Sequence, residues 1–193
     1  MFDLVIDTSY KYLYIALVKD GKVYSERMQE GNNNHSEMLT DCLKNLLKDS
    51  KVSIGEVKRV LVCKGPGSYT GLRVAGTVAK VLAHAERIPL WTFSSLDLLL
   101  SSYLDQDGFY VAYMDARRGG AFAKTVRIIK GNFETVQDDI YIPFSDLQNL
   151  YPDAIYLNAV NPQYDIPKLL EKGLIEEVKD VHSFVPNYLR SGV

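Results

Sequence analysis

Residue types that build metal sites and disulfide frameworks are scarce in this chain of 193 residues. Its two cysteines, Cys42 and Cys63, form no Cys-x-x-Cys motif, and its three histidines form no His-x3-His pair. We therefore expect reduced cysteines and no bound metal. A net charge of -2 gives no electrostatic basis for independent binding to nucleic acid. The sequence also has no leader-like segment and no apolar run long enough to cross a membrane, so we expect a cytoplasmic protein without membrane contact.

The most informative motif that is present is GPGSYTGLR, from Gly65 to Arg73. It lies between an apolar, strand-like run and a helical segment, and a glycine-rich turn that opens a helix can bind an anion. However, no lysine follows Gly71 as in a Walker loop, and the glycines read Gly-x-Gly-x3-Gly rather than the dinucleotide fingerprint. The other interpretation is conformational: the glycines permit a tight turn, and Ser68 or Thr70 caps the helix.

The order of elements is repeated in the two halves of the chain. In the first half we expect strands at 2–8, 12–18, 22–28 and 59–64, and helices at 36–49 and 72–87. In the second half we expect strands at 109–114, 120–129, 135–142 and 154–159, and helices at 145–150 and 166–174. Asp115 follows Asp7 by 108 residues and the turn residue Gly131 follows Gly21 by 110, which indicates internal duplication.

Two further local patterns help to place the helices. Asn34 and Glu37 resemble a capping box at the start of the first helix. A connecting helix is expected at 94–107. Its buried positions would be Leu96, Leu99, Leu100 and Leu104.

Two duplicated βββαβα halves around a cleft resemble the α/β fold of the actin, Hsp70 and sugar-kinase (ASKHA) superfamily. The resemblance implies that a hairpin tip in each half holds an ATP phosphate. The candidate vestigial phosphate-binding residues are Asp7, Thr8, Ser9, Asp115, Arg117 and Arg118. Because arginines stand where the superfamily usually has glycine, we do not expect a working ATPase.

Motifs along nearly the whole chain resemble the TsaB (YeaZ) family. They are Ile6–Ser9, His35–Leu39, the GPGSYTGLR block, Ser94–Leu96, Asp115–Arg118 and the tail Pro186–Arg190. The family-motif loop comprises Gly65, Pro66, Gly67, Ser68, Tyr69, Thr70 and Arg73. On this resemblance we expect an N-terminal lobe with the connecting helix at 1–107 and a shortened C-terminal lobe at 108–193.

The resemblance implies a non-catalytic partner of the TsaD transferase in the formation of N6-threonylcarbamoyladenosine (t6A) at position 37 of tRNAs that read ANN codons. TsaE is the accessory ATPase, and ATP and a divalent metal belong to these partner subunits, so this chain is expected to bind no cofactor itself. Contact with tRNA is expected only through the complex. TsaD holds its metal partly through a His-x3-His pair, and Ser95 and Leu99 stand at those positions here.

Pairing with TsaD or with a second copy is expected through two helices. Small residues recur at every fourth position of the second helix, which permits close approach of another helix, although packing against the chain's own sheet explains them equally well. The expected interface residues are His35, Met38, Leu39, Cys42, Gly71, Leu72, Ala75, Gly76, Ala79 and Ala83. We expect Ala79→Arg to abolish pairing with TsaD and to leave thermal unfolding nearly unchanged. The alternative function is an ATP-binding small-molecule kinase or ATPase of the same fold, and a bare structural module is a third option.

Overall fold

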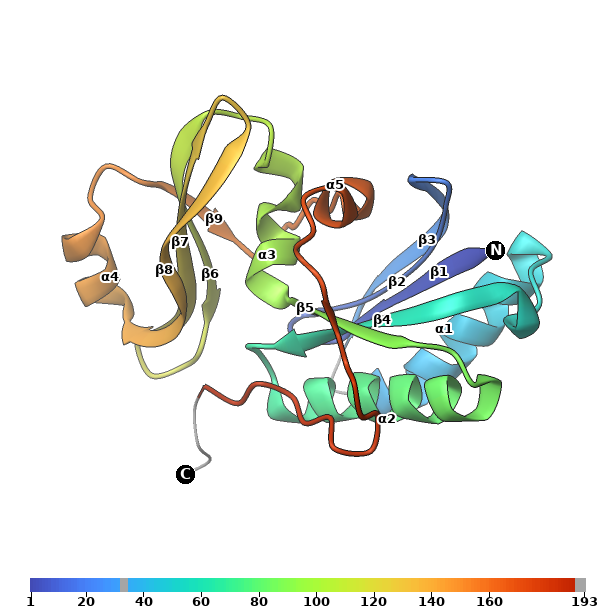
Figure 1. The fold of residues 1–193 in the computed structure, drawn as a ribbon. Coiled ribbons are helices and arrows are strands. Elements are labelled where there is room, and N and C mark those ends of the chain that lie inside the picture. Colours follow the sequence, from blue (N-terminus) through green and yellow to red (C-terminus); the bar gives the residue numbers. More distant parts are fainter. Residues whose placement is uncertain (32–34, 190–193) are drawn as a thin grey trace.

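Two β-sheets form the two lobes of the molecule, and a short helix lies between them (Figure 1). The computed structural model describes residues 1–31 and 35–189, with side chains described except at 35–37. The first lobe contains, in chain order, β1 (Phe2–Asp7), β2 (Tyr12–Lys19), β3 (Lys22–Glu30), α1 (His35–Ser50), η1 (Ile54–Glu56), β4 (Val57–Gly65), α2 (Tyr69–Glu86) and β5 (Leu90–Ser94). The later elements are α3 (Ser95–Leu100), η2 (Ser101–Tyr103), β6 (Gly108–Asp115), β7 (Gly120–Ile129), β8 (Asn132–Pro143), α4 (Phe144–Leu150), β9 (Ile155–Asn158), α5 (Ile166–Glu171) and β10 (Glu176–Glu177).

Strand order confirms the duplication. The first sheet has the order β10-β5-β4-β1-β2-β3 and the second has β8-β7-β6-β9, so β3-β2-β1-β4 and β8-β7-β6-β9 are equivalent. The hairpin turns are equivalent too, since Asp20 and Gly21 have φ of 50° and 70°, and Lys130 and Gly131 have 52° and 73°. This duplicated, two-lobed α/β arrangement is the ASKHA fold that the sequence predicts.

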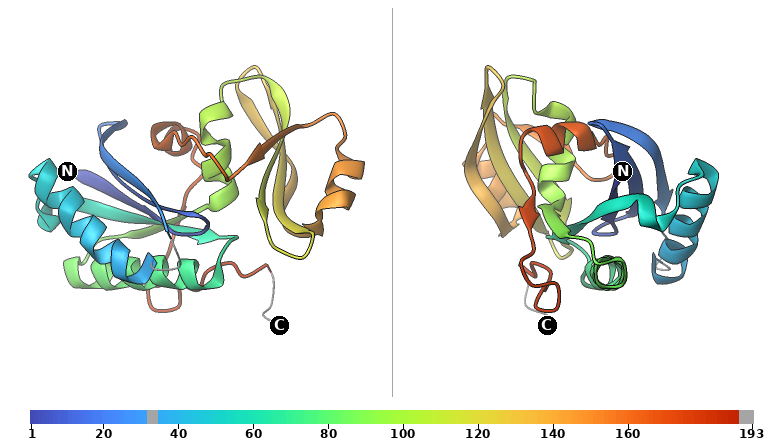
Figure 2. Two further views of the ribbon diagram at one scale, coloured as in Figure 1. Left: turned by 180° about the vertical axis from the view of Figure 1, so that it is seen from behind. Right: turned by 45° about the vertical axis from the view of Figure 1, so that its right-hand side comes forward.

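The central strand β1 is buried along its whole length because both faces of the first sheet are covered. Successive side chains of β1 point to opposite faces. Leu4 and Ile6 pack in the core under α1 and α2, and Val5 packs on the other face with Ile166 and Leu169 of α5. Figure 2 shows α1 and α2 side by side on one face of this sheet.

The chain after β9 returns to the first lobe. α5 contacts η2, α3 and β3, and β10 pairs with β5 at the edge of the first sheet. The helix was expected at 166–174 and ends at Glu171, and the strand β5 was not expected at all. Sequence reasoning missed β5 because a run of five residues carries too little periodicity to be read as a strand. Except for β10, the strands of the first sheet precede residue 108 and those of the second sheet follow it. Residues 166–189 lie mainly against the first lobe, and Leu174 and Leu189 also pack against the core of the second.

The connecting segment is shorter as a helix than the sequence predicts, since α3 ends at Leu100 and a 3-10 turn follows. The four leucines expected inside it, at 96, 99, 100 and 104, are all buried, as predicted. The capping box expected at Asn34 lies outside the described residues. Among the described helices, none is both long and apolar enough to cross a membrane.

Candidate docking helix and cleft loops

The turn between β4 and α2 lies directly against the first hairpin tip. Ser68 caps α2 as predicted: its hydroxyl accepts a hydrogen bond from the Gly71 amide at 3.3 Å. The Ser68 amide donates to the Ser9 carbonyl at 2.6 Å. A β-carbon on Gly67 would lie 2.2 Å from the Ser9 carbonyl oxygen, and one on Gly71 would lie 1.9 Å from that of Thr8. Two of the motif glycines are therefore required by close approach to this tip.

The first tip, Asp7 to Ser9, is buried and bonded within the chain. The Thr8 hydroxyl donates to the Gly71 carbonyl at 2.7 Å, and the Ser9 amide donates to Asp7 Oδ1 at 2.7 Å. A phosphate site needs amides and hydroxyls that point at the ligand. The amide of Ser9 and the hydroxyl of Thr8 instead hold the tip together and fasten it to α2.

The second tip is an exposed turn with left-handed backbone. Arg117, Arg118 and Gly119 have φ of 65°, 52° and 74°, and the Arg117 amide donates to Asp115 Oδ1 at 2.8 Å. The two tips meet where Tyr10 lies near Asp115: burial and the Asp115 charge raise the pKa of the Tyr10 phenol. Arg117 and Arg118 are exposed.

The small-residue face of α2 packs inside this chain, as the alternative interpretation of its spacing expects, so these side chains do not themselves face outward. Gly71, Leu72, Ala75, Gly76, Ala79 and Ala83 are all buried. The three alanines belong to the core beneath α1 and α2. A β-carbon on Gly76 would contact the rings of Phe184 at 3.4 Å and Pro186 at 3.8 Å, so the C-terminal tail covers that position. Small residues at these positions allow α2 to approach the sheet and the tail closely.

The expected interface residues of α1 that the structure describes also pack inside this chain. Leu39 and Cys42 are buried, and the Cys42 thiol donates to Gln29 Oε1 at 2.7 Å. Met38 is partly buried against the same core. The side chain of His35 lies outside the described residues.

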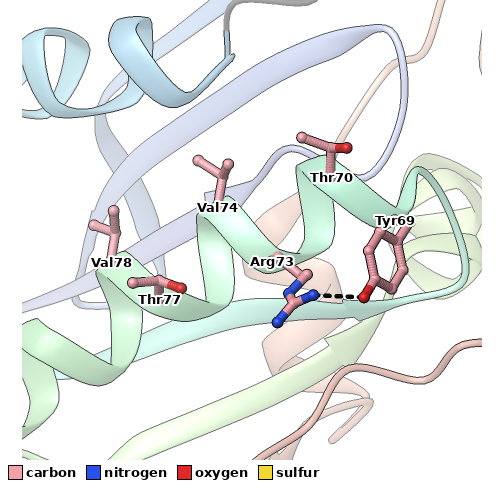
Figure 3. Close-up of a pocket in the computed structure, with 6 residues that line it drawn as sticks. All are labelled: Tyr69, Thr70, Arg73, Val74, Thr77 and Val78. Carbon is pink, nitrogen blue, oxygen red and sulfur yellow. Dashed lines mark hydrogen bonds between the residues drawn. The ribbon is translucent and has the colours of Figure 1, made fainter.

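The outward side of α2 presents larger side chains. A shallow groove of about 360 Å³ runs along it and is lined by Tyr69, Thr70, Arg73, Val74, Thr77 and Val78 (Figure 3). One turn further on, Val81 is 61% exposed. The Arg73 guanidinium donates to the Tyr69 hydroxyl, and the Tyr69 ring packs against Tyr188 of the tail at 4.9 Å between centroids. We call this side of α2, formed by the groove residues and Val81, the outward stripe. It includes Tyr69, Thr70 and Arg73 of the GPGSYTGLR motif, and helical periodicity alone does not predict that these residues are exposed.

Comparison with known proteins gives concordant results. Residues 27–190 match the family model described as TsaD, tRNA N6-adenosine threonylcarbamoyltransferase. A Bacillus subtilis relative named tRNA threonylcarbamoyladenosine biosynthesis protein TsaB is 30% identical, over 97% of this chain and 93% of its own. This chain belongs to the TsaB (YeaZ) family.

Solved structures agree with this fold. The structure of YeaZ from Pseudomonas aeruginosa has a TM-score of 0.80 and 20% identity, covering 97% of this chain and 99% of its own. A second structure, described as an uncharacterized protein with similarity to peptidase YEAZ from the same organism, has a TM-score of 0.80 and 21% identity, covering 98% and 99%. At these identities the likeness concerns the fold.

In this member of the TsaB family, the positions expected to correspond to metal-binding histidines serve packing. The Ser95 hydroxyl donates to the Pro66 carbonyl in the GPG turn, and Leu99 belongs to the core between α3 and the second sheet. No group of three or more His, Cys, Asp or Glu residues suited to a metal ion occurs within residues 1–31 and 35–189. Burial raises the pKa of the Cys63 and Cys42 thiols, which disfavours the nucleophilic thiolate.

Proposed function

We propose that this chain is a non-catalytic docking subunit for a TsaD transferase in t6A formation at position 37 of tRNAs that read ANN codons. Membership of the TsaB family supports a role in threonylcarbamoyladenosine biosynthesis. ATP and a divalent metal would be bound by the partner subunits, TsaE would join the same assembly, and tRNA would be contacted only through the complex. The compartment would be the cytoplasm, where tRNA is modified.

The observation that carries the docking role is the outward stripe of α2. Tyrosine and arginine dominate the binding energy of many interfaces, and Tyr69 and Arg73 stand next to a groove with exposed Val81 beyond it. Alongside α2 lies α1, whose Met38 is partly buried. We infer that TsaD and a second copy of this chain compete for this two-helix face, over an interface of about 1,600 Å².

A pair of substitutions on the outward stripe tests this role. Thr77 is exposed, and Val81 is 61% exposed, so Thr77→Arg and Val81→Arg add charge where no core packing is lost. Each should weaken binding to TsaD at least tenfold in a titration by calorimetry and reduce t6A formation in the reconstituted system. The midpoint of thermal unfolding should stay within a degree or two. Val136→Arg, at a position 42% exposed on β8 in the other lobe, is the matched control and should bind TsaD like the unsubstituted chain.

Two results would count against this role. If Val81→Arg and Val136→Arg bind TsaD equally well, the outward stripe is not the docking surface. Micromolar binding of Mg-ATP by the isolated chain would favour the kinase or ATPase alternative. We do not expect this result, because the first tip is buried and hydrogen-bonded within the chain.

A further inference from the structure

A buried lysine connects the second sheet to the connecting helix α3. Lys124 extends from β7, and its side chain is only 8% exposed. Its Nζ lies 2.7 Å from Asp97 Oδ1 on α3, 3.4 Å from Asp138 Oδ1 and 3.8 Å from Asp139 Oδ1 on β8. The side chains of Asp97 and Asp139 are each 9% exposed, whereas that of Asp138 is 81% exposed. Three carboxylates thus surround one ammonium group at the boundary between the sheets.

A second contact crosses the same boundary. Asp139 Oδ2 accepts a hydrogen bond from the Ser94 hydroxyl at 2.7 Å, and Ser94 ends β5 of the first sheet. The same hydroxyl oxygen accepts from the Leu96 amide at 3.1 Å and so caps α3. The carboxyl group of Asp139 is therefore bonded to the element where the first lobe passes into the connecting helix.

The charges at this junction do not balance when every carboxyl group is ionised. Burial raises the pKa of Asp139 to about 6, against the opposing effects of the Ser94 hydrogen bond and the Lys124 charge. Burial likewise raises the pKa of Asp97. Burial lowers the pKa of Lys124, but the combined effect of Asp97, Asp139 and Asp138 outweighs burial and the net change is upward, so the lysine keeps its proton. One lysine cannot neutralise two buried carboxylates, and an uncompensated buried charge is costly.

The remaining charged neighbours lie at the rim of the cluster. Asp138 accepts from the Asp139 amide at 2.9 Å, and this bond is the main reason that its pKa is lowered. Lys64 of β4 is paired with Glu176 at 2.8 Å. The Lys64 charge contributes to the lowered pKa of Asp138 and partly opposes the rise that burial causes in the pKa of Asp97. Asp138 and Glu176, whose pKa values are lowered, are therefore ionised at neutral pH. Of the two buried carboxyl groups, Asp97 lies closer to the Lys124 ammonium, at 2.7 Å against 3.8 Å, so we assign the proton to Asp139.

We propose that the contact of Asp139 with Ser94 is a proton-linked latch between the lobes. The latch is closed when Asp139 carries a proton, because the cost of burying its charge is then removed. It is loosened when Asp139 is ionised, because the Ser94 hydrogen bond and the Lys124 charge offset that cost only in part. The sign follows from linkage. The pKa of Asp139 is raised above its ordinary value of 3.8, so the folded state favours the protonated form. The stabilisation that this carboxyl group contributes is complete below pH 4 and is lost as the pH rises through about 6.

The latch is connected to the GPG turn. Ser95 follows Ser94 directly, and its buried hydroxyl donates to the Pro66 carbonyl. A displacement of β8 from Ser94 would therefore be transmitted to the turn from which α2 begins. The latch itself does not depend on the proposed docking role, since its contacts lie within one chain.

Spin-label distance measurements test the latch in the full chain. Labels on Lys44→Cys of α1 and Leu150→Cys of α4 report on the two lobes, and both positions are exposed. The native cysteines are buried, and treating the unsubstituted chain with the spin-label reagent shows whether they react. We expect a narrower distance distribution at pH 5 than at pH 8, and Asp139→Asn should give the narrow distribution at both. Asp138→Asn is the matched control and should respond to pH like the unsubstituted chain.

A distance distribution that is the same at pH 5 and pH 8 would overturn the latch, as would a pH response that survives unchanged in Asp139→Asn. A second variant guards against misfolding of the first. Because the Ser94 hydrogen bond lowers the pKa of Asp139, Ser94→Ala should move the carboxyl titration of Asp139, followed by 13C NMR, to higher pH. Titration of Asp139 near 3.8 in the unsubstituted chain would equally reject the proposal.

Discussion

Gly71 has two structural roles in the first turn of α2. Its amide donates to the capping hydroxyl of Ser68, and its backbone lies against the first hairpin tip. Its carbonyl accepts from the Thr8 hydroxyl, and its missing β-carbon leaves room for the Thr8 carbonyl. The contact fixes where α2 starts relative to β1. The motif glycine is thus explained by packing between two backbones, with no need for a bound anion.

The substitution Gly71→Ala should destabilise the fold. Its β-carbon would be placed 1.9 Å from the Thr8 carbonyl oxygen, a backbone atom that cannot move away by itself. We expect a loss of about 2 kcal/mol or more in the free energy of unfolding, measured by urea denaturation. Gly55→Ala is the control, because no atom lies within 4 Å of its β-carbon position. Equal stability of the two variants would contradict this account of the motif.

At the scale of one element, α2 has two sides with different tasks. Its small residues contact the sheet and the tail, and its outward stripe contains Tyr69, Arg73 and Val81. Ala79→Arg should therefore unfold the chain, contrary to the expectation from sequence, because residue 79 is fully buried. Variants that probe docking belong on the other side of the helix.

The N-cap of α2 can be tested by a substitution at Ser68, which precedes the helix. Ser68→Ala removes the hydroxyl that accepts from the Gly71 amide, and a lost cap of this type costs about 1 kcal/mol. We expect a lower midpoint of thermal unfolding by circular dichroism. Thr70→Ala, which changes an exposed residue two positions along, should leave that midpoint nearly unchanged. If Thr70→Ala lowered the midpoint more than Ser68→Ala, the assignment of the cap to Ser68 would be wrong.

At the scale of the whole molecule, the C-terminal tail holds α2 in place. Lys80 Nζ donates to the carbonyls of His182 and Phe184 at 2.8 and 3.3 Å. The Asn187 amide donates to the Lys64 carbonyl at 2.6 Å, beside the GPG turn, and Leu189 packs against the core of the second lobe. The tail thus contacts both lobes and α2. Figure 1 shows it, in dark red, running from α5 past the first sheet to α2.

Removing one ring from the tail should show how much it contributes. Phe184 is partly buried against the core and lies over Gly76, so Phe184→Ala should lower the free energy of unfolding by about 2 kcal/mol. The neighbouring Val185 is 67% exposed, and Val185→Ala should change the free energy of unfolding by less than about 0.5 kcal/mol. Urea denaturation measures both. If the two losses were the same, the tail would not be part of the cooperative core.

The sequence by itself determined the features that depend on neighbouring residues. The βββαβα order of each half and the turns at Asp20-Gly21 and Lys130-Gly131 follow from local φ preferences and periodicity. The sequence left the cap of α2 open between Ser68 and Thr70, and the structure assigns it to Ser68. The leucines of the connecting segment were buried as expected for the same reason.

Only the tertiary structure decided which surface is inside. A stripe of alanines at helical spacing fits a sheet or a partner equally well, and its burial in the core with residues of β1 and β4 shows that it packs inside the chain. The return of α5 and β10 to the first lobe and the meeting of Asp97, Lys124 and Asp139 also join distant segments. Such pairings depend on how the whole core packs, and no local pattern encodes them.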